Sequence, residues 1–147
     1  MHVEPCFDVA HLGHIELLTN KPEASLEFFT DIFGLSVSGQ EGDSVYLRAY
    51  DDYEFHTLKL TASNTTGMRH VGYRCASPQA LARRVAAIET LGAGIGWSKG
   101  DLGHGPAYQF RDPDDHVFEI YYETRRYEPP ADQRPALKNQ AQRMSGR

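Results

Sequence analysis

Two stretches of the chain alternate between apolar and polar side chains, and the first of them covers residues 10–19. Ile15 and Leu17 fall on one side of this segment, and His14 and Glu16 fall on the other, which is the pattern of a strand. A segment with helical periodicity follows, and then three short strand patterns separated by turn residues. The first part of the chain is therefore predicted to have the order strand, helix and three strands.

The second stretch, residues 68–75, begins a copy of the same order. His70 stands where His14 stands in the first copy, and the helical segment that follows ends at Gly92, as the first helix ends at Gly34. Such self-similarity is the signature of an internal repeat. We expect strands and helices, in order, at residues 10–19, 20–34, 35–39, 44–50, 54–61, 68–75, 77–92, 95–98, 107–111 and 116–122.

Each predicted helix has a recognisable start. Asn20 can cap the first helix, with Pro22 in its first turn and Glu23 completing a capping box. Ser77 and Pro78 are the corresponding signals for the second helix. Both helices are therefore predicted to begin at a side-chain cap.

A single strand-and-helix unit cannot bury its apolar face alone, so the two units are expected to share one core. The predicted fold class is α+β, with paired βαβββ modules forming a curled mixed sheet around a cavity. The modules cover about residues 9–62 and 67–123 of a domain that spans residues 1–124. Residues 125–147 are polar and rich in basic side chains, and we interpret them as a linker or tail.

Composition limits the classes of partner and compartment. The net charge of −5 comes without a basic stripe, so neither nucleic acid nor a membrane surface is an expected partner. Cys6 and Cys75 lack the spacing of a metal or redox motif, which favours a reducing compartment over a disulfide framework. No apolar stretch approaches the length of a membrane span, and the expected localisation is cytoplasmic.

Three residues at equivalent strand positions are candidate metal ligands. Superposing the two copies places His14 on His70, and it places Lys59 on Glu119. Two histidines and one carboxylate form the donor set of metal sites that leave positions open for a bidentate substrate and dioxygen at Fe(II). Since an ammonium cannot ligate a metal, we hypothesise that Lys59 pairs with Glu119 in the place of the ion.

His56 is a further candidate for the cavity. Strict alternation along residues 54–61 places His56 and Lys59 on opposite faces of one strand. Unless a bulge intervenes, only one of these two side chains is therefore expected to line the cavity.

Several segments of the sequence resemble the vicinal oxygen chelate superfamily, across roughly residues 9–123. They are residues 14–17, 28–35, 69–71 and 112–121. Within this superfamily, residues 56–61, 103–105 and 121–123 are most similar to the ring-cleaving type I extradiol dioxygenases, such as the catechol 2,3-dioxygenases. The resemblance implies an enzyme of aromatic catabolism that acts on a catecholic diol and dioxygen.

The same resemblance implies roles for individual residues. His14, His70 and Glu119 fall on the positions that bind Fe(II), and His56 falls on the acid–base histidine. Gln109 stands where the family's catalytic domain has a tyrosine. Gly100 stands near the expected place of a second, loop-borne histidine.

Family members of this kind are fusions of two such domains with iron only in the second. We therefore interpret this chain as the N-terminal domain of such an enzyme, which binds iron weakly or not at all. Its expected partners are a C-terminal catalytic domain or a second subunit, within a homo-oligomer.

Two other functions remain open from the sequence. The first is a metal-dependent lyase or isomerase of the same superfamily, but that chemistry generally uses a fourth ligand at the place of Lys59. The second is a non-enzymatic module that binds a small ligand, for which the paired histidines His14 and His70 would be unnecessary.

Overall fold

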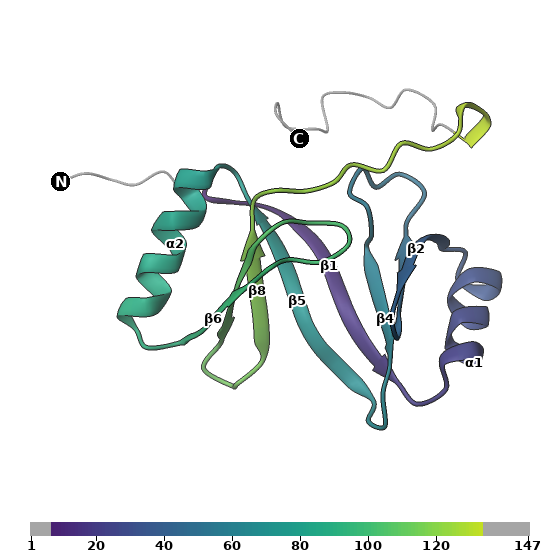
Figure 1. The fold of residues 1–147 in the computed structure, drawn as a ribbon, viewed down its shortest axis with the longest axis horizontal. Helices are drawn as coiled ribbons and strands as arrows, with labels where there is room; N and C mark the ends of the chain where they lie inside the picture. The colour runs from purple at the N-terminus through teal and green to yellow at the C-terminus, as the bar shows by residue number, and fades with distance from the viewer. Residues whose placement is uncertain (1–6, 134–147) are drawn as a thin grey trace.

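The computed structural model describes residues 7–133 of the chain (Figure 1). The first module consists of β1 (Val9–Thr19), α1 (Pro22–Glu27), a π-helical turn η1 (Phe28–Ile32), β2 (Ser36–Glu41), β3 (Ser44–Arg48) and β4 (Leu58–Ala62). The second consists of β5 (Gly67–Cys75), α2 (Pro78–Thr90), β6 (Gly94–Ser98), β7 (Ala107–Arg111) and β8 (Val117–Tyr121), and a short 3-10 turn η2 (Ala131–Gln133) follows. The predicted βαβββ order, stated twice, is confirmed.

All eight strands belong to one mixed sheet with the order β2-β3-β4-β1-β5-β8-β7-β6. Each module contributes one half of this order, and the halves meet where β1 and β5 pair antiparallel. Within each half the first strand pairs in parallel with the last, β1 with β4 and β5 with β8. The predicted fold class is therefore confirmed, with β2 and β6 as the two edges of an open sheet.

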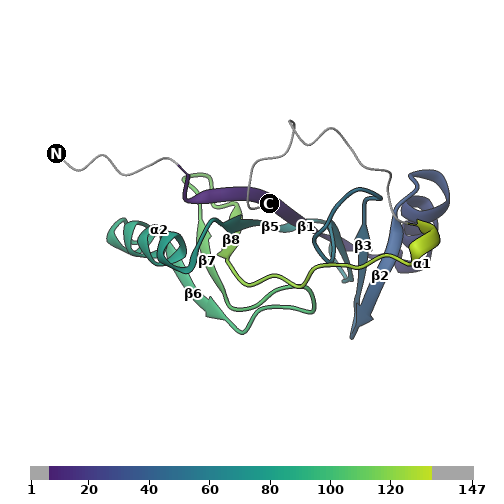
Figure 2. The ribbon, with the colours of Figure 1, turned by 90° about the horizontal axis from the view of Figure 1, so that it is seen from above.

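The second helix behaves as its sequence predicts. Ser77 caps α2, because its side chain accepts a hydrogen bond from the backbone N–H of Ala80. The helix packs on the outer face of the sheet and closes a core whose buried members are Cys75, Ala80, Val85, Tyr108 and Ile120. Figures 1 and 2 place α2 at one end of the molecule and α1 at the other.

The first helix departs from the prediction in two ways. It begins at Pro22 after Lys21, and Asn20 does not cap it. Neither α1 nor η1 buries a residue, and Ile32 and Phe33 are 75% and 65% exposed. The expectation that both helical stripes share one core is therefore wrong for the first helix, which lies at the outer end of its half of the sheet (Figure 1) and leaves its apolar side chains partly or largely exposed.

Alternation along the strands gives the sheet a polar face and an apolar face. In β5, His70 and Gly72 lie on the polar face, while Val71 and Tyr73 lie on the opposite one. The cavity that lies against the polar face has a volume of about 500 Å³. The side chains that matter for function therefore gather on this face.

The segment after β8 returns to the first module. The N–H of Arg125 donates to the carbonyl of Gly103, and the N–H of Tyr127 donates to the carbonyl of Tyr53. This path across the molecule is visible in Figure 2. The boundary at residue 124 and the linker interpretation of residues 125–147 stay predictions, and residues 134–147 lie outside the described part.

Two smaller expectations concern cysteines and membranes. Cys75 is a free, buried thiol, and burial raises its pKa to about 11. Cys6 lies outside the described residues. Within residues 7–133, no helix is long and apolar enough to cross a membrane.

Candidate metal centre

Three buried side chains converge on one point at the centre of the sheet. His14 Nε2 lies 2.9 Å from His70 Nε2 and 3.0 Å from Glu119 Oε1. His70 Nε2 lies 3.0 Å from the same carboxylate oxygen. All three residues are at least 95% buried. The convergence predicted from their equivalent places in the two copies is therefore present.

The register of the strands explains this convergence. His14 lies beside Gly72 across the β1–β5 pair, and Gly72 lies beside Glu119 across the β5–β8 pair. Two residues along β1 and β5, Glu16 lies beside His70. The two central strands thus bring one histidine each to neighbouring positions, and β8 adds the carboxylate.

Gly72 makes room for the imidazole of His14. A Cβ atom at residue 72 would lie 2.4 Å from His14 Cε1 and 2.6 Å from His14 Nε2. Contacts this short do not occur in folded proteins, so a side chain at residue 72 must displace the His14 ring. Glycine is therefore required here for close approach.

Replacing Gly72 by alanine is expected to lower the free energy of unfolding by about 1–3 kcal/mol, the usual cost of overpacking a filled interior. It should also displace His14 and weaken metal binding. Chemical denaturation and metal titration would measure the two effects. Tyr73→Phe on the opposite face of β5 is the control, and unchanged metal affinity in Gly72→Ala would contradict the role given to Gly72.

Charges in the centre are shared unequally among the three residues. Burial opposes ionisation of Glu119, but the surrounding histidines hold the pKa of its carboxyl far below the usual range. Burial lowers the pKa of His70, but hydrogen bonds to Glu119 and Glu16 outweigh it and raise the pKa to about 9. For His14, burial dominates and lowers the pKa. Without a metal, His70 therefore carries the positive charge at neutral pH.

The donor set fits a divalent metal. Three ligands at right angles around an ion, each about 2.1 Å from it, stand about 3 Å apart. The three observed separations are 2.9, 3.0 and 3.0 Å. The three ligand atoms also form the one group among the described residues whose donor geometry could hold an ion. An ion here would take the place of the proton on His70 Nε2.

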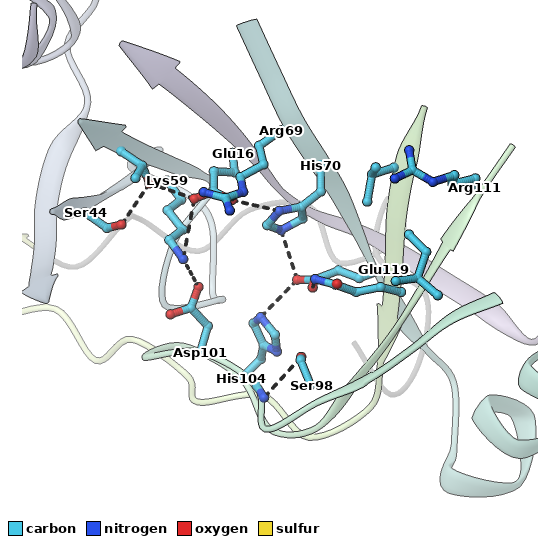
Figure 3. A pocket seen from close by; sticks show the side chains of 15 residues that line it. Glu16, Ser44, Lys59, Arg69, His70, Ser98, Asp101, His104, Arg111 and Glu119 are labelled. Carbon is cyan, nitrogen blue, oxygen red and sulfur yellow. Dashed lines mark hydrogen bonds and ion pairs between the residues drawn. The ribbon is translucent and has the colours of Figure 1, made fainter. Parts of the chain in front are cut away.

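A fourth histidine, His104, was missed by the sequence analysis. Its Nδ1–H donates to the carbonyl of Gly105, and its Nε2 lies 3.2 Å from Glu119 Oε1. The loop between β6 and β7 brings it there (Figure 3). The expectation that Gly100 leaves this loop without a histidine at the site is therefore wrong, since the side chain comes from four residues further on.

His56 also reaches the centre, for a reason that alternation does not cover. It precedes β4, which begins at Leu58, so the face rule for strands does not apply to it. Its ring lies 4.5 Å from the ring of His14, and its Nε2 has no hydrogen-bond partner. Burial lowers the pKa of His56 to about 2, and His14 and His104 act in the same direction. Lys59 lines the cavity and His56 does not, so the prediction that only one of these two side chains lines it is confirmed, although the imidazole of His56 still packs against His14.

Lys59 does not pair with Glu119. Its ammonium nitrogen lies 2.5 Å from Asp101 Oδ2 and 3.6 Å from Glu16 Oε2 (Figure 3). Lys59 lies beside Glu16 in the β1–β4 register, so its side chain reaches the neighbouring carboxylate and the β6–β7 loop. The hypothesis that Lys59 takes the place of the metal is therefore wrong. The ammonium of Lys59 does not lie between His14, His70 and Glu119.

Comparison with known proteins establishes the family. Residues 11–120 match the model of the Glyoxalase/Bleomycin resistance protein/Dioxygenase superfamily. The chain belongs to this superfamily.

The chain is also similar to individual dioxygenases of known name. The chain is 52% identical over 136 residues to a metapyrocatechase of Geobacillus stearothermophilus, covering 92% of the chain and 42% of the relative. It is 35% identical to a manganese-dependent 2,3-dihydroxybiphenyl 1,2-dioxygenase of Geobacillus genomosp. 3, covering 94% of the chain and 44% of the relative. The chain thus spans less than half the length of these relatives.

Solved structures of dioxygenases share the fold of this chain. A homoprotocatechuate 2,3-dioxygenase from Brevibacterium fuscum, in a variant complex, superposes with a TM-score of 0.78 at 26% identity, covering 86% of the chain and 36% of that protein. The native enzyme from Arthrobacter globiformis gives the same TM-score at 26% identity, with 84% and 39% covered. The neighbours named here are ring-cleaving dioxygenases whose fold this chain shares.

Proposed function

We propose that this chain is the N-terminal domain of an extradiol dioxygenase that opens the ring of a catecholic diol, and that His14, His70 and Glu119 bind a divalent metal, Fe(II), in this domain. This replaces the interpretation that the chain binds iron weakly or not at all, because Lys59 pairs with Asp101 and Glu16 and does not stand between the three ligands. The observation that carries the proposal is the facial arrangement of these three ligand atoms in a chain of this superfamily. The similarity to metapyrocatechase supports the reaction, and the greater length of the relatives supports a further domain.

Each residue of the centre has a definite task in this proposal. A divalent ion held here would act as a Lewis acid for the diol oxygens and as the place where dioxygen reacts. His14, His70 and Glu119 hold it from one side, which leaves the cavity side for substrate. His56 is the proposed acid–base residue, because its ring lies 4.5 Å from the ring of His14 and its Nε2 has no hydrogen-bond partner.

The proposal includes partners and a compartment. The exposed apolar side chains of η1 and the residue after it, Ile32 and Phe33, support a second domain or subunit that covers them. We further propose that the protein forms a homo-oligomer in the cytoplasm. The lyase alternative is less well supported, because Lys59 occupies the place of a fourth ligand and is held by Asp101 and Glu16.

The proposal is tested by metal analysis of the 147-residue chain purified and loaded without oxygen. One equivalent of Fe(II) that changes its spectrum when catechol is added would support it. Selective retention of Ni(II) or Zn(II), with no response to catechol, would favour the lyase. Protein that retains no metal under any loading condition would contradict the proposed metal centre.

A further inference from the structure

We propose that Glu16 is a positioning residue of this metal centre, which fixes the ring of His70 through Nδ1 and is itself held in place by Lys59 and Thr61. The inference rests on the proposed metal binding by His14, His70 and Glu119. It assigns a function to a buried carboxylate that the ligand set leaves unexplained.

The contact between Glu16 and His70 is direct. Glu16 Oε1 lies 3.0 Å from His70 Nδ1, on the side of the ring opposite the nitrogen that faces Glu119 (Figure 3). An ionised carboxylate only accepts hydrogen bonds, so Nδ1 carries the proton of this pair. A neutral His70 then has its lone pair on Nε2, which is the form that binds a metal. A second partner of this kind usually orients a metal-bound histidine and raises its basicity.

The other oxygen of Glu16 is also engaged. Thr61 Oγ1 donates to Glu16 Oε2 at 2.7 Å, and Lys59 Nζ lies 3.6 Å from the same oxygen. Arg69, whose side chain is 61% exposed, lies 3.8 Å from Oε1. Glu16 itself is only 4% exposed. A carboxylate this deeply buried stays ionised only with such partners, so these contacts fix both its charge and its orientation.

The support extends away from the centre. Ser44 Oγ bonds to Thr61 Oγ1 at 2.8 Å, and Lys59 also holds Asp101 in the loop that carries His104. The hydroxyl of Tyr46 donates to that same Asp101 carboxylate. The ring of His70 is therefore tied, through Glu16, to two neighbouring strands and to the loop that covers the cavity.

A break in the internal symmetry points to the same assignment. Glu16 follows His14 by two residues, as Gly72 follows His70, so residues 16 and 72 are equivalent in the repeat. Glycine at 72 leaves space for a ligand ring, whereas residue 16 places a charged group against one. The residues beside them on the adjacent parallel strands differ as well. Lys59 on β4 lies beside Glu16, whereas Glu119 on β8 lies beside Gly72. One module thus supplies the metal carboxylate, and the other supplies an ion pair that supports a ligand.

The test compares Glu16→Ala and Glu16→Gln in the 147-residue chain, with Glu23→Gln in α1 as the control because it is exposed and remote. We would measure the dissociation constant of Mn(II) by calorimetry for each folded variant. Loss of an outer partner usually weakens metal binding 10- to 100-fold, which is the expected effect of Glu16→Ala. Glu16→Gln should show a smaller loss, since its amide oxygen still accepts from His70 Nδ1 but carries no charge.

A second readout separates positioning from a merely structural role. Nitrogen NMR of histidine-labelled, Zn(II)-loaded protein should show His70 with a protonated Nδ1 and a metal-bound Nε2. Glu16→Ala should add a population with another tautomer or ring orientation. If Glu16 only stabilised the fold, its variants would lower the melting temperature and leave this spectrum and the metal affinity unchanged.

The outcomes also distinguish the inference from the proposed function. A wild-type chain that binds metal, with Glu16→Ala and Glu16→Gln binding it equally well, would overturn the role of Glu16 alone. A wild-type chain that binds no metal would overturn the metal centre and this inference together. Should Glu16→Ala fail to fold, Glu16→Gln decides the matter, because glutamine preserves the volume of the side chain.

Discussion

Replacing Glu119 by glutamine is expected to abolish metal binding by this chain. Glu119 is the one anionic ligand of the proposed centre, and its Oε1 lies within 3.2 Å of three histidine nitrogens. A neutral amide keeps the shape but provides neither the charge nor a strong donor atom for a divalent ion. We expect the affinity for Fe(II) or Mn(II) to fall by more than the roughly 100-fold that the loss of an outer partner can cause.

Anaerobic calorimetry and elemental analysis of the folded variant would measure this loss. Glu123→Gln is the matched control, because Glu123 is exposed and lies outside the ligand group. Metal bound to Glu119→Gln as tightly as to the wild-type chain would show that the ion, if any, is held elsewhere.

The Fe(II)-loaded chain by itself is expected to cleave catechol slowly, at about 10⁻³ to 10⁻¹ s⁻¹. A missing proton donor usually costs about 10²–10⁴-fold, taken from a typical turnover of about 10 s⁻¹. Gln109 faces Glu119 across the β7–β8 pair, and its amide can donate a hydrogen bond but cannot transfer a proton. Among the described residues that line the cavity, none is a tyrosine. Formation of the yellow ring-fission product would be followed against free iron.

Gln109→Tyr should raise this turnover, whereas Gln109→Phe, which lacks the hydroxyl, should not. This comparison of turnover separates the effect of the hydroxyl group from the effect of a larger side chain. Turnover near 10 s⁻¹ in the unmodified chain would instead show that one such domain is a complete dioxygenase, and that a second domain is not needed for ring cleavage.

The position of His104 differs from what the sequence analysis predicted for this site. We expected the site to lack both the tyrosine and the loop histidine, because Gly100 stands near the expected place of the histidine. The β6–β7 loop instead brings His104 Nε2 to 3.2 Å from Glu119 Oε1. The expectation of slow turnover therefore rests on Gln109, which stands where the resemblance implies a tyrosine.

The order of elements and the identity of the three candidate ligands could be predicted from the sequence. Local periodicity places apolar and polar side chains on the faces of β1 and β5, and the repeat makes His14 and His70 equivalent. Equivalent positions in a paired repeat meet near its axis, so their convergence follows without any knowledge of the loops. The cap of α2 was also predictable, because Ser77 acts on the backbone only three residues away.

Only the tertiary structure decided which charged and titratable groups surround those ligands. Lys59 was assigned to Glu119 from the repeat, yet the β1–β4 register places it beside Glu16. The positions of His56 and His104 depend on irregular segments, for which no periodicity exists. Register across strands far apart in sequence, together with the conformation of loops, is fixed by packing of the whole sheet. The local sequence therefore predicted which residues are candidate metal ligands, and the pairing of distant strands determined which charged groups surround them.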